Sequence, residues 1–81
     1  MVQVHFAAGL RRFTDGVAQI DVEAGTVREL ISVLDARFPG VGAQLNSGTS
    51  VAINGEIIAD ALYEELPENA EVHFLATLSG G

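Results

Sequence analysis

The sequence contains no cysteine, and its unbroken apolar runs are short. The absence of cysteine excludes a disulfide framework, a thiolate metal site and a cysteine nucleophile together. No apolar run approaches the roughly 20 residues that a membrane-spanning helix needs, and we identify no signal peptide. We therefore expect a cytoplasmic protein that does not contact a membrane.

Positive charge is also scarce, because four arginines stand against eleven carboxylates and lysine is missing entirely. The net charge of −7 argues against nucleic acid as a partner, since binding phosphates needs clustered Lys and Arg. It favours a protein partner with a basic docking surface. The alternative is that the charge simply keeps a small domain in solution.

The composition is that of one folded domain, because 48% of the 81 residues are hydrophobic. Apolar and polar residues alternate over residues 2–7 and again over 18–22, which predicts two strands. The segment 8–16 holds two glycines and the pair Arg11-Arg12, and it is predicted as a turn region. We expect the two strands to form a hairpin.

The following segment gives the clearest helix signal. Thr26 is a good N-cap, and Glu29 follows three residues later in the capping-box pattern. Pro39-Gly40 ends the helix. Apolar residues at helical spacing form one stripe between these signals: Val27, Leu30, Ile31, Leu34 and Phe38.

The second half of the chain reads as short strands and turns. Residues 41–50 are predicted as a loop with at most a helical turn at 43–45. Asn54-Gly55 between short apolar runs predicts a hairpin over 51–58. A single helical turn is predicted within 60–66, and alternation predicts a last strand over 71–76.

These elements predict the fold class α+β. One helix with one apolar stripe covers one face of a sheet, and the first and last strands lie side by side and parallel at its centre. This arrangement is the β-grasp, a ubiquitin-like mixed sheet of four to five strands packed on one main helix. We expect a β-grasp domain over residues 1–76 and a flexible C-terminal tail over 77–81.

The tail ends in Gly80-Gly81. A glycine carboxylate without a neighbouring Cβ can enter a narrow active site that a larger residue would block. Enzymes that adenylate the C-terminus of a protein need a substrate of that shape. The alternative is a disordered end that finishes in glycine by chance.

The domain and its tail together resemble the MoaD/ThiS family of sulfur carrier proteins. The segment 4–11 is similar to the first strand and turn of the molybdopterin synthase small subunit, and 71–75 is similar to its last strand. Leu78-Ser79-Gly80-Gly81 matches the tail, whereas 51–55 is equally similar to the thiamine-pathway carrier. The chain departs from molybdopterin-type carriers at Leu75, where an aromatic is common, and in lacking prolines at 76–77.

The resemblance implies a carrier and co-substrate, not an enzyme, although it can serve as the small subunit of a molybdopterin synthase-like enzyme. An E1-like adenylyltransferase transfers AMP from ATP to the Gly81 carboxylate, and a sulfur donor then displaces AMP to leave a thiocarboxylate. The acceptor is a synthase of the molybdopterin synthase large-subunit or thiazole synthase type. No cofactor is expected on the chain itself, and ATP is used by the partner.

The site residues follow from this picture. Gly81 is adenylated and thiocarboxylated, and Gly80, Ser79 and Leu78 thread the tail into the partner. Four residues on the outward sheet face or beside it are predicted to dock the partner: Leu75, His73, Ala7 and Arg11.

The remaining polar residues give no further site. His5 and His73 fall on neighbouring strands, but two ligands without a third do not make a metal site, so no metal is predicted. The carboxylates of the last third are predicted to form a solvated acidic edge: Asp60, Glu64, Glu65, Glu68 and Glu71.

Three functions stay open at this point. The first is the sulfur carrier, with the molybdopterin pathway favoured and the thiamine and cysteine pathways possible. The second is a ubiquitin-like modifier conjugated to lysines through Gly81. The third is a non-covalent β-grasp binding module whose tail has no role.

Overall fold

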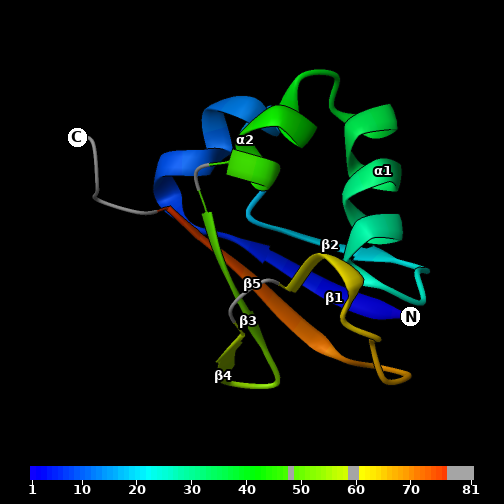
Figure 1. The fold of residues 1–81 in the computed structure, drawn as a ribbon. Helices are drawn as coiled ribbons and strands as arrows, with labels where there is room; N and C mark the ends of the chain where they lie inside the picture. The colour runs from blue at the N-terminus through cyan, green and yellow to red at the C-terminus, as the bar shows by residue number, and fades with distance from the viewer. Residues whose placement is uncertain (48, 59–60, 77–81) are drawn as a thin grey trace.

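The first and last strands lie side by side at the centre of one five-stranded sheet, whose strand order is β2-β1-β5-β3-β4 (Figure 1). The computed structural model describes residues 1–47, 49–58 and 61–76. The two central strands run parallel, with Val4 opposite Val72 and Phe6 opposite Phe74. The other neighbouring pairs are antiparallel. The predicted mixed β-grasp sheet is confirmed, with five strands.

The order of elements along the chain also agrees with the prediction in outline. Within the described ranges no helix is long and apolar enough to cross a membrane. The elements, with η for a 3₁₀ helix, are β1 (Val2–Phe6), η1 (Ala8–Phe13), β2 (Gln19–Val22), α1 (Val27–Arg37), α2 (Val41–Ser47), β3 (Thr49–Ile53), β4 (Glu56–Ile58), η2 (Ala61–Tyr63) and β5 (Glu71–Ala76).

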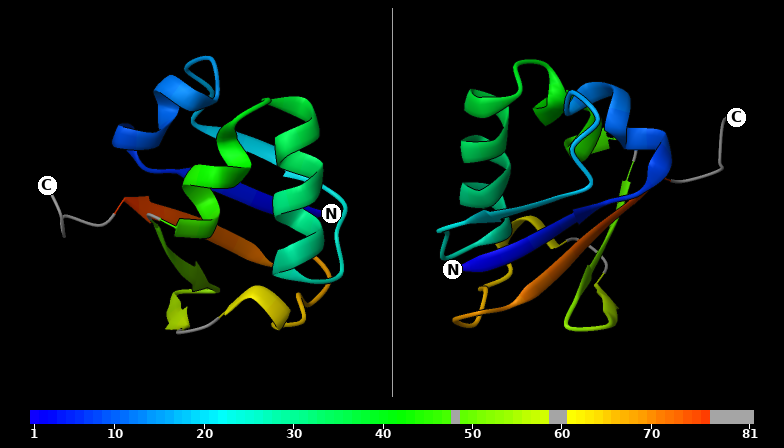
Figure 2. Two further views of the ribbon diagram at one scale, coloured as in Figure 1. Left: turned by 45° about the horizontal axis from the view of Figure 1, so that its top comes forward. Right: turned by 180° about the vertical axis from the view of Figure 1, so that it is seen from behind.

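Both α-helices lie on the same face of the sheet, and Figure 2 shows this arrangement from two further sides. The core fills the space between the two layers. Phe6 stacks near Phe74, with ring centroids 6.1 Å apart, and meets Phe38 of the helical layer edge-on at 6.4 Å. Val4, Phe6, Val72 and Phe74 are therefore buried in the core, whereas the opposite side, which we call the outward sheet face, carries His5, Glu71, His73 and Leu75.

The start of α1 is fixed by the predicted cap, with one difference. Thr26 Oγ1 accepts a hydrogen bond from the Glu29 backbone N–H at 3.1 Å. The Glu29 carboxylate accepts from the Gly25 N–H at 2.7 Å, one residue before the partner expected in a capping box. The chain on either side of the cap also pairs with residues 64–66, since the Leu66 N–H donates to the Gly25 carbonyl at 2.8 Å.

The predicted loop over 41–50 is wrong, because residues 41–47 form α2. Val41 and Leu45, four residues apart, are both buried against the core. The carboxylate of Asp35, near the end of α1, accepts hydrogen bonds from the N–H groups of Gly40 at 3.2 Å and Gly42 at 2.9 Å. A side chain of the preceding helix thus satisfies backbone donors where α2 begins.

The predicted turn region over 8–16 contains a 3₁₀ helix, η1, before the turn itself. Leu10 anchors it in the core. Thr14 is completely buried, and its hydroxyl donates to the Val17 carbonyl at 2.8 Å. Asp15 and Gly16 both have positive φ and complete the reversal into β2.

The Asn54-Gly55 hairpin is confirmed, with φ of 50° and 85° as a primed turn requires. The helical turn predicted within 60–66 is also present as η2. Asp60 of that prediction lies outside the described residues.

The cap of α1 gives a first test. Replacing Thr26 by Ala removes the acceptor for the Glu29 N–H, so we expect a loss of about 0.5–2 kcal/mol in the free energy of unfolding. Denaturant unfolding measures it. The matched control is Ser32→Ala on the exposed face of the same helix, which should change stability by less than about 0.5 kcal/mol. Equal stability of both variants would contradict the assignment.

Candidate functional site

The candidate site lies on the outward sheet face, where β1 and β5 meet. The parallel register places His5 beside His73 and Gln3 beside Glu71. His5, His73 and Leu75 are half-buried, and Arg11 is exposed. A shallow hollow of about 330 Å³ opens here, and its lining includes all four residues predicted to dock a partner: Ala7, Arg11, His73 and Leu75. The structure therefore brings them together, and their docking role stays a prediction.

The backbone around this hollow is well anchored. The Ala7 N–H donates to the Phe74 carbonyl at 3.0 Å, which extends the β1–β5 pairing by one residue. Arg11 reaches back to the same place, and its Nε donates to the Phe6 carbonyl at 3.2 Å. Apart from its predicted docking role, Arg11 thus satisfies a backbone acceptor at the end of β1.

The two histidines form a stacked pair. Their ring centroids lie 4.3 Å apart and the ring planes differ by 7°. Among the residues that the structure describes, none offers a hydrogen-bond partner to His5 Nε2, although this atom is buried. An unsatisfied buried polar atom costs about 1–3 kcal/mol, so the arrangement is unusual for a purely structural histidine.

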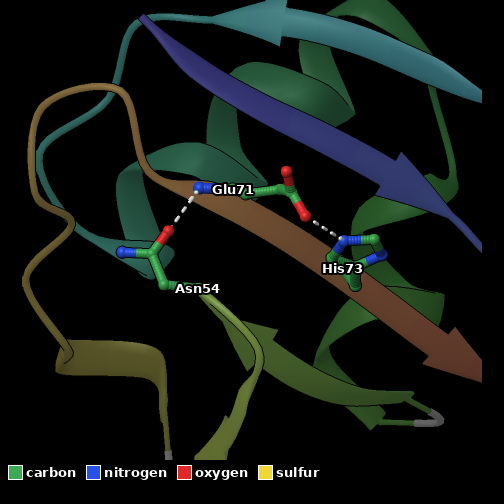
Figure 3. Close-up of polar contacts among 3 residues, drawn as sticks. All are labelled: Asn54, Glu71 and His73. Atoms are coloured by element: carbon green, nitrogen blue, oxygen red, sulfur yellow. Dashed lines mark hydrogen bonds and ion pairs between the residues drawn. The ribbon is translucent and has the colours of Figure 1, made fainter.

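Glu71 was predicted as part of a solvated acidic edge, and the structure gives it a specific contact. Its Oε1 lies 2.9 Å from His73 Nε2 (Figure 3). This hydrogen bond lowers the pKa of the Glu71 carboxyl below its ordinary value, with smaller contributions from the charges of both histidines. One ligand atom from each of His5, Glu71 and His73 lies within 4.8 Å of the other two.

Asn54 is a site residue that the sequence reasoning used only as a turn former. Its Oδ1 accepts from the Glu71 N–H at 2.9 Å, and its own N–H donates to the Glu71 carbonyl at 2.8 Å. Figure 3 shows the Asn54 side chain reaching from the β3–β4 turn to the first residue of β5. The turn therefore holds the backbone from which the Glu71 carboxylate projects.

The tail residues Leu78, Ser79, Gly80 and Gly81 lie outside the described residues. The structure does describe the strand that precedes them. Ala76 ends the central strand β5 and pairs with Thr49 of β3. The last residue before the tail is thus held by the sheet.

The Asn54 contact can be tested directly. Asn54→Ala removes the bond to the Glu71 N–H and puts a residue without a polar side chain at positive φ, so we expect a loss of about 1–2 kcal/mol in unfolding free energy. Asn54→Gly relieves the backbone strain and is the control that isolates the hydrogen bond. Amide exchange at Glu71 should become faster in both variants. Unchanged exchange would show that the contact does not hold β5.

Comparisons with known proteins place the chain in a family. The model of the ThiS family matches residues 4–81. A search of curated protein sequences finds no match. Among solved structures, a chain of the Amycolatopsis orientalis BexX/CysO complex is similar over 100% of both chains, with 25% identity and a TM-score of 0.87.

Two further structures share the fold at lower identity. The small archaeal modifier protein 1 from Methanosarcina acetivorans is 21% identical, with a TM-score of 0.84 over 99% of this chain and 95% of that one. A chain of the complex of subunits 1 and 2 of the Helicobacter pylori molybdopterin-converting factor is 18% identical, with a TM-score of 0.70 over 99% and 98%. The chain belongs to the ThiS family, whose small carrier proteins are not enzymes themselves and act as partners of synthase complexes.

Proposed function

We propose that the chain is a sulfur carrier whose Gly81 carboxylate is adenylated and then converted to a thiocarboxylate. An E1-like adenylyltransferase forms the mixed anhydride with AMP from ATP and releases pyrophosphate. A sulfur donor then displaces AMP and leaves –COSH on Gly81. Adenylation must come before sulfur transfer because a carboxylate is a poor electrophile until its oxygen belongs to a good leaving group.

The observation that carries the proposal is the position of β5. It is the central strand, paired with β1 on one edge and β3 on the other, and Ala76 is its last residue. Five residues separate this anchor from the end of Gly81, an extended reach of about 17 Å. A tail of that length can enter a buried active site while the sheet stays outside, and the family match extends through Gly81.

The hollow beside β5 supports a docking role for the outward sheet face. The hollow lies next to the end of β5, after which the tail follows, so one partner can bind the hollow and the tail at the same time. Leu75 supplies half-buried apolar surface there, and Arg11 supplies a charge at the rim. Interfaces commonly combine an apolar centre with a polar rim in this way.

The sulfur acceptor is proposed to be a synthase. The sequence favoured the molybdopterin pathway, but the TM-score to the chain from the BexX/CysO complex, 0.87, exceeds the 0.70 of the molybdopterin-converting factor. This similarity favours a partner like that in the BexX/CysO complex over a molybdopterin synthase large subunit. Copurification from cells identifies the synthase.

A ubiquitin-like modifier is the second candidate, and the similarity to the small archaeal modifier protein 1 supports it. Both functions begin with the same adenylation of Gly81. The chain itself contains no lysine, so an activated C-terminus cannot be captured by an ε-amine of another copy.

Intact-mass spectrometry of the protein from cells tests the carrier function. Replacement of one carboxylate oxygen by sulfur adds about 16 Da, and we expect this species in the full-length chain. A variant lacking Gly80 and Gly81 should show neither the mass gain nor function. Gly-Gly remnants on lysines of other proteins, without the mass gain, would favour the modifier. If the truncated variant keeps full function, the carrier and the modifier are both excluded, and a non-covalent binding module is the remaining candidate function.

Leu75 provides a test of the docking surface. Leu75→Glu puts a charge into the half-buried hollow, so we expect the affinity for the adenylyltransferase to fall roughly tenfold or more. Val33→Glu, on the exposed surface of α1, is the matched control and should change affinity less than about twofold. Calorimetric titration measures both. If both variants bind like the natural chain, docking does not use this face.

A further inference from the structure

The polar cluster on the outward sheet face carries an inference that is independent of the tail chemistry. We propose that His5, Glu71 and His73 form a three-ligand site for a divalent transition-metal ion such as Zn²⁺. The argument rests on the placement of the three side chains, on the unsatisfied nitrogen of His5 and on the ligand chemistry.

The placement comes from the strands. His5 and His73 are direct neighbours in the parallel β1–β5 pair, and Glu71 lies two residues before His73 on the same face of β5. Both strands lie in the interior of the sheet. Asn54 forms hydrogen bonds with both the N–H and the carbonyl of Glu71, and it thereby holds the Glu71 backbone in place. The three side chains therefore project from rigid backbone, which reduces the entropy lost when they converge on an ion.

The ligand atoms are already close to the required spacing. In a tetrahedral zinc site with bonds of about 2.1 Å, neighbouring ligand atoms are about 3.4 Å apart. Here the three atoms lie within 4.8 Å of one another, and His73 Nε2 and Glu71 Oε1 are 2.9 Å apart. A bound ion replaces the proton that these two atoms share, and they separate slightly.

His5 supplies the observation that points to a ligand. Within the described part of the chain its buried Nε2 has no hydrogen-bond partner, and coordination is one way to satisfy such an atom. The ring is stacked on His73 with a plane difference of 7°, so the in-plane lone pairs of the two rings lie in nearly parallel planes and do not converge on one point. Binding therefore requires the rings to rotate out of the stack until their nitrogen edges converge.

The donor set selects the class of ion. Two imidazoles and one carboxylate suit zinc, nickel or copper and fit magnesium and calcium poorly, because those hard ions prefer oxygen ligands. Three protein ligands leave the fourth tetrahedral position to water. The net charge of −7 adds a favourable field for any cation.

The chain is well suited to a clean test because it has no cysteine and only these two histidines. Untagged, chelator-treated full-length protein is titrated with ZnCl₂ by calorimetry, without any partner enzyme. We expect one ion per chain, and NMR should show the ring resonances of both histidines shifting to saturation at one equivalent. His5→Gln and His73→Gln should each weaken binding at least about tenfold, because changing even a residue that only supports a metal ligand typically costs about 10–100-fold in affinity.

Glu71→Gln tests the third ligand, and Glu56→Gln is its matched control. Both carboxylates are exposed and lie on strands, but Glu56 is outside the cluster. Glu71→Gln should weaken binding several-fold, whereas Glu56→Gln should leave the affinity unchanged. Backbone spectra establish that each variant is folded, and if one histidine variant does not fold, the remaining variants still decide the question.

Three outcomes would overturn the site. The first is the absence of saturable binding at one equivalent. The second is equal affinity of the natural chain and the histidine variants, which would mean adventitious binding to the acidic surface. The third is an unchanged pair of histidine resonances while zinc binds elsewhere.

Discussion

The parallel pairing of β1 with β5 is the interaction on which the rest of the structure depends. β5 is hydrogen-bonded on both edges, and as in any strand the side chains of residues 71–75 alternate between the outward sheet face and the core. Inward Phe74 meets Phe6 in the centre of the core, and outward His73 meets His5. One strand thus organises the hydrophobic centre, the polar cluster and the backbone that leads into the tail.

Much of the fold could be predicted because its signals are local. The two-residue alternation in β1 and β5, the cap at Thr26 and the Asn54-Gly55 turn each specify structure through residues within a few positions of one another. Helix α2 could not be predicted in this way. Its apolar pattern has only two buried members, and the Asp35 carboxylate that satisfies its first donors belongs to another helix.

The candidate site was predictable to a similar extent. Strand alternation and parallel pairing were enough to place His73, Leu75 and Ala7 on one face. The contact of Glu71 with His73 was missed because the carboxylates were treated as one acidic group. Glu71 lies two residues before His73 on β5, so both side chains are on the same face. The hydrogen bond that Glu71 N–H donates to Asn54 Oδ1 spans 17 residues, and only the folded topology brings the two together.

The central position of β5 also affects how the protein reaches its fold. β1 and its antiparallel neighbour β2 are both synthesised early. The strand that pairs with the other edge of β1 follows some 65 residues later. Until then, one row of backbone N–H and C=O groups of β1 has no partner strand. Closing so long a loop is entropically costly and slows the search. During synthesis this edge of β1 therefore stays unpaired until residues 71–76 emerge, and this interval is when the chain is most open to aggregation and to capture by a chaperone.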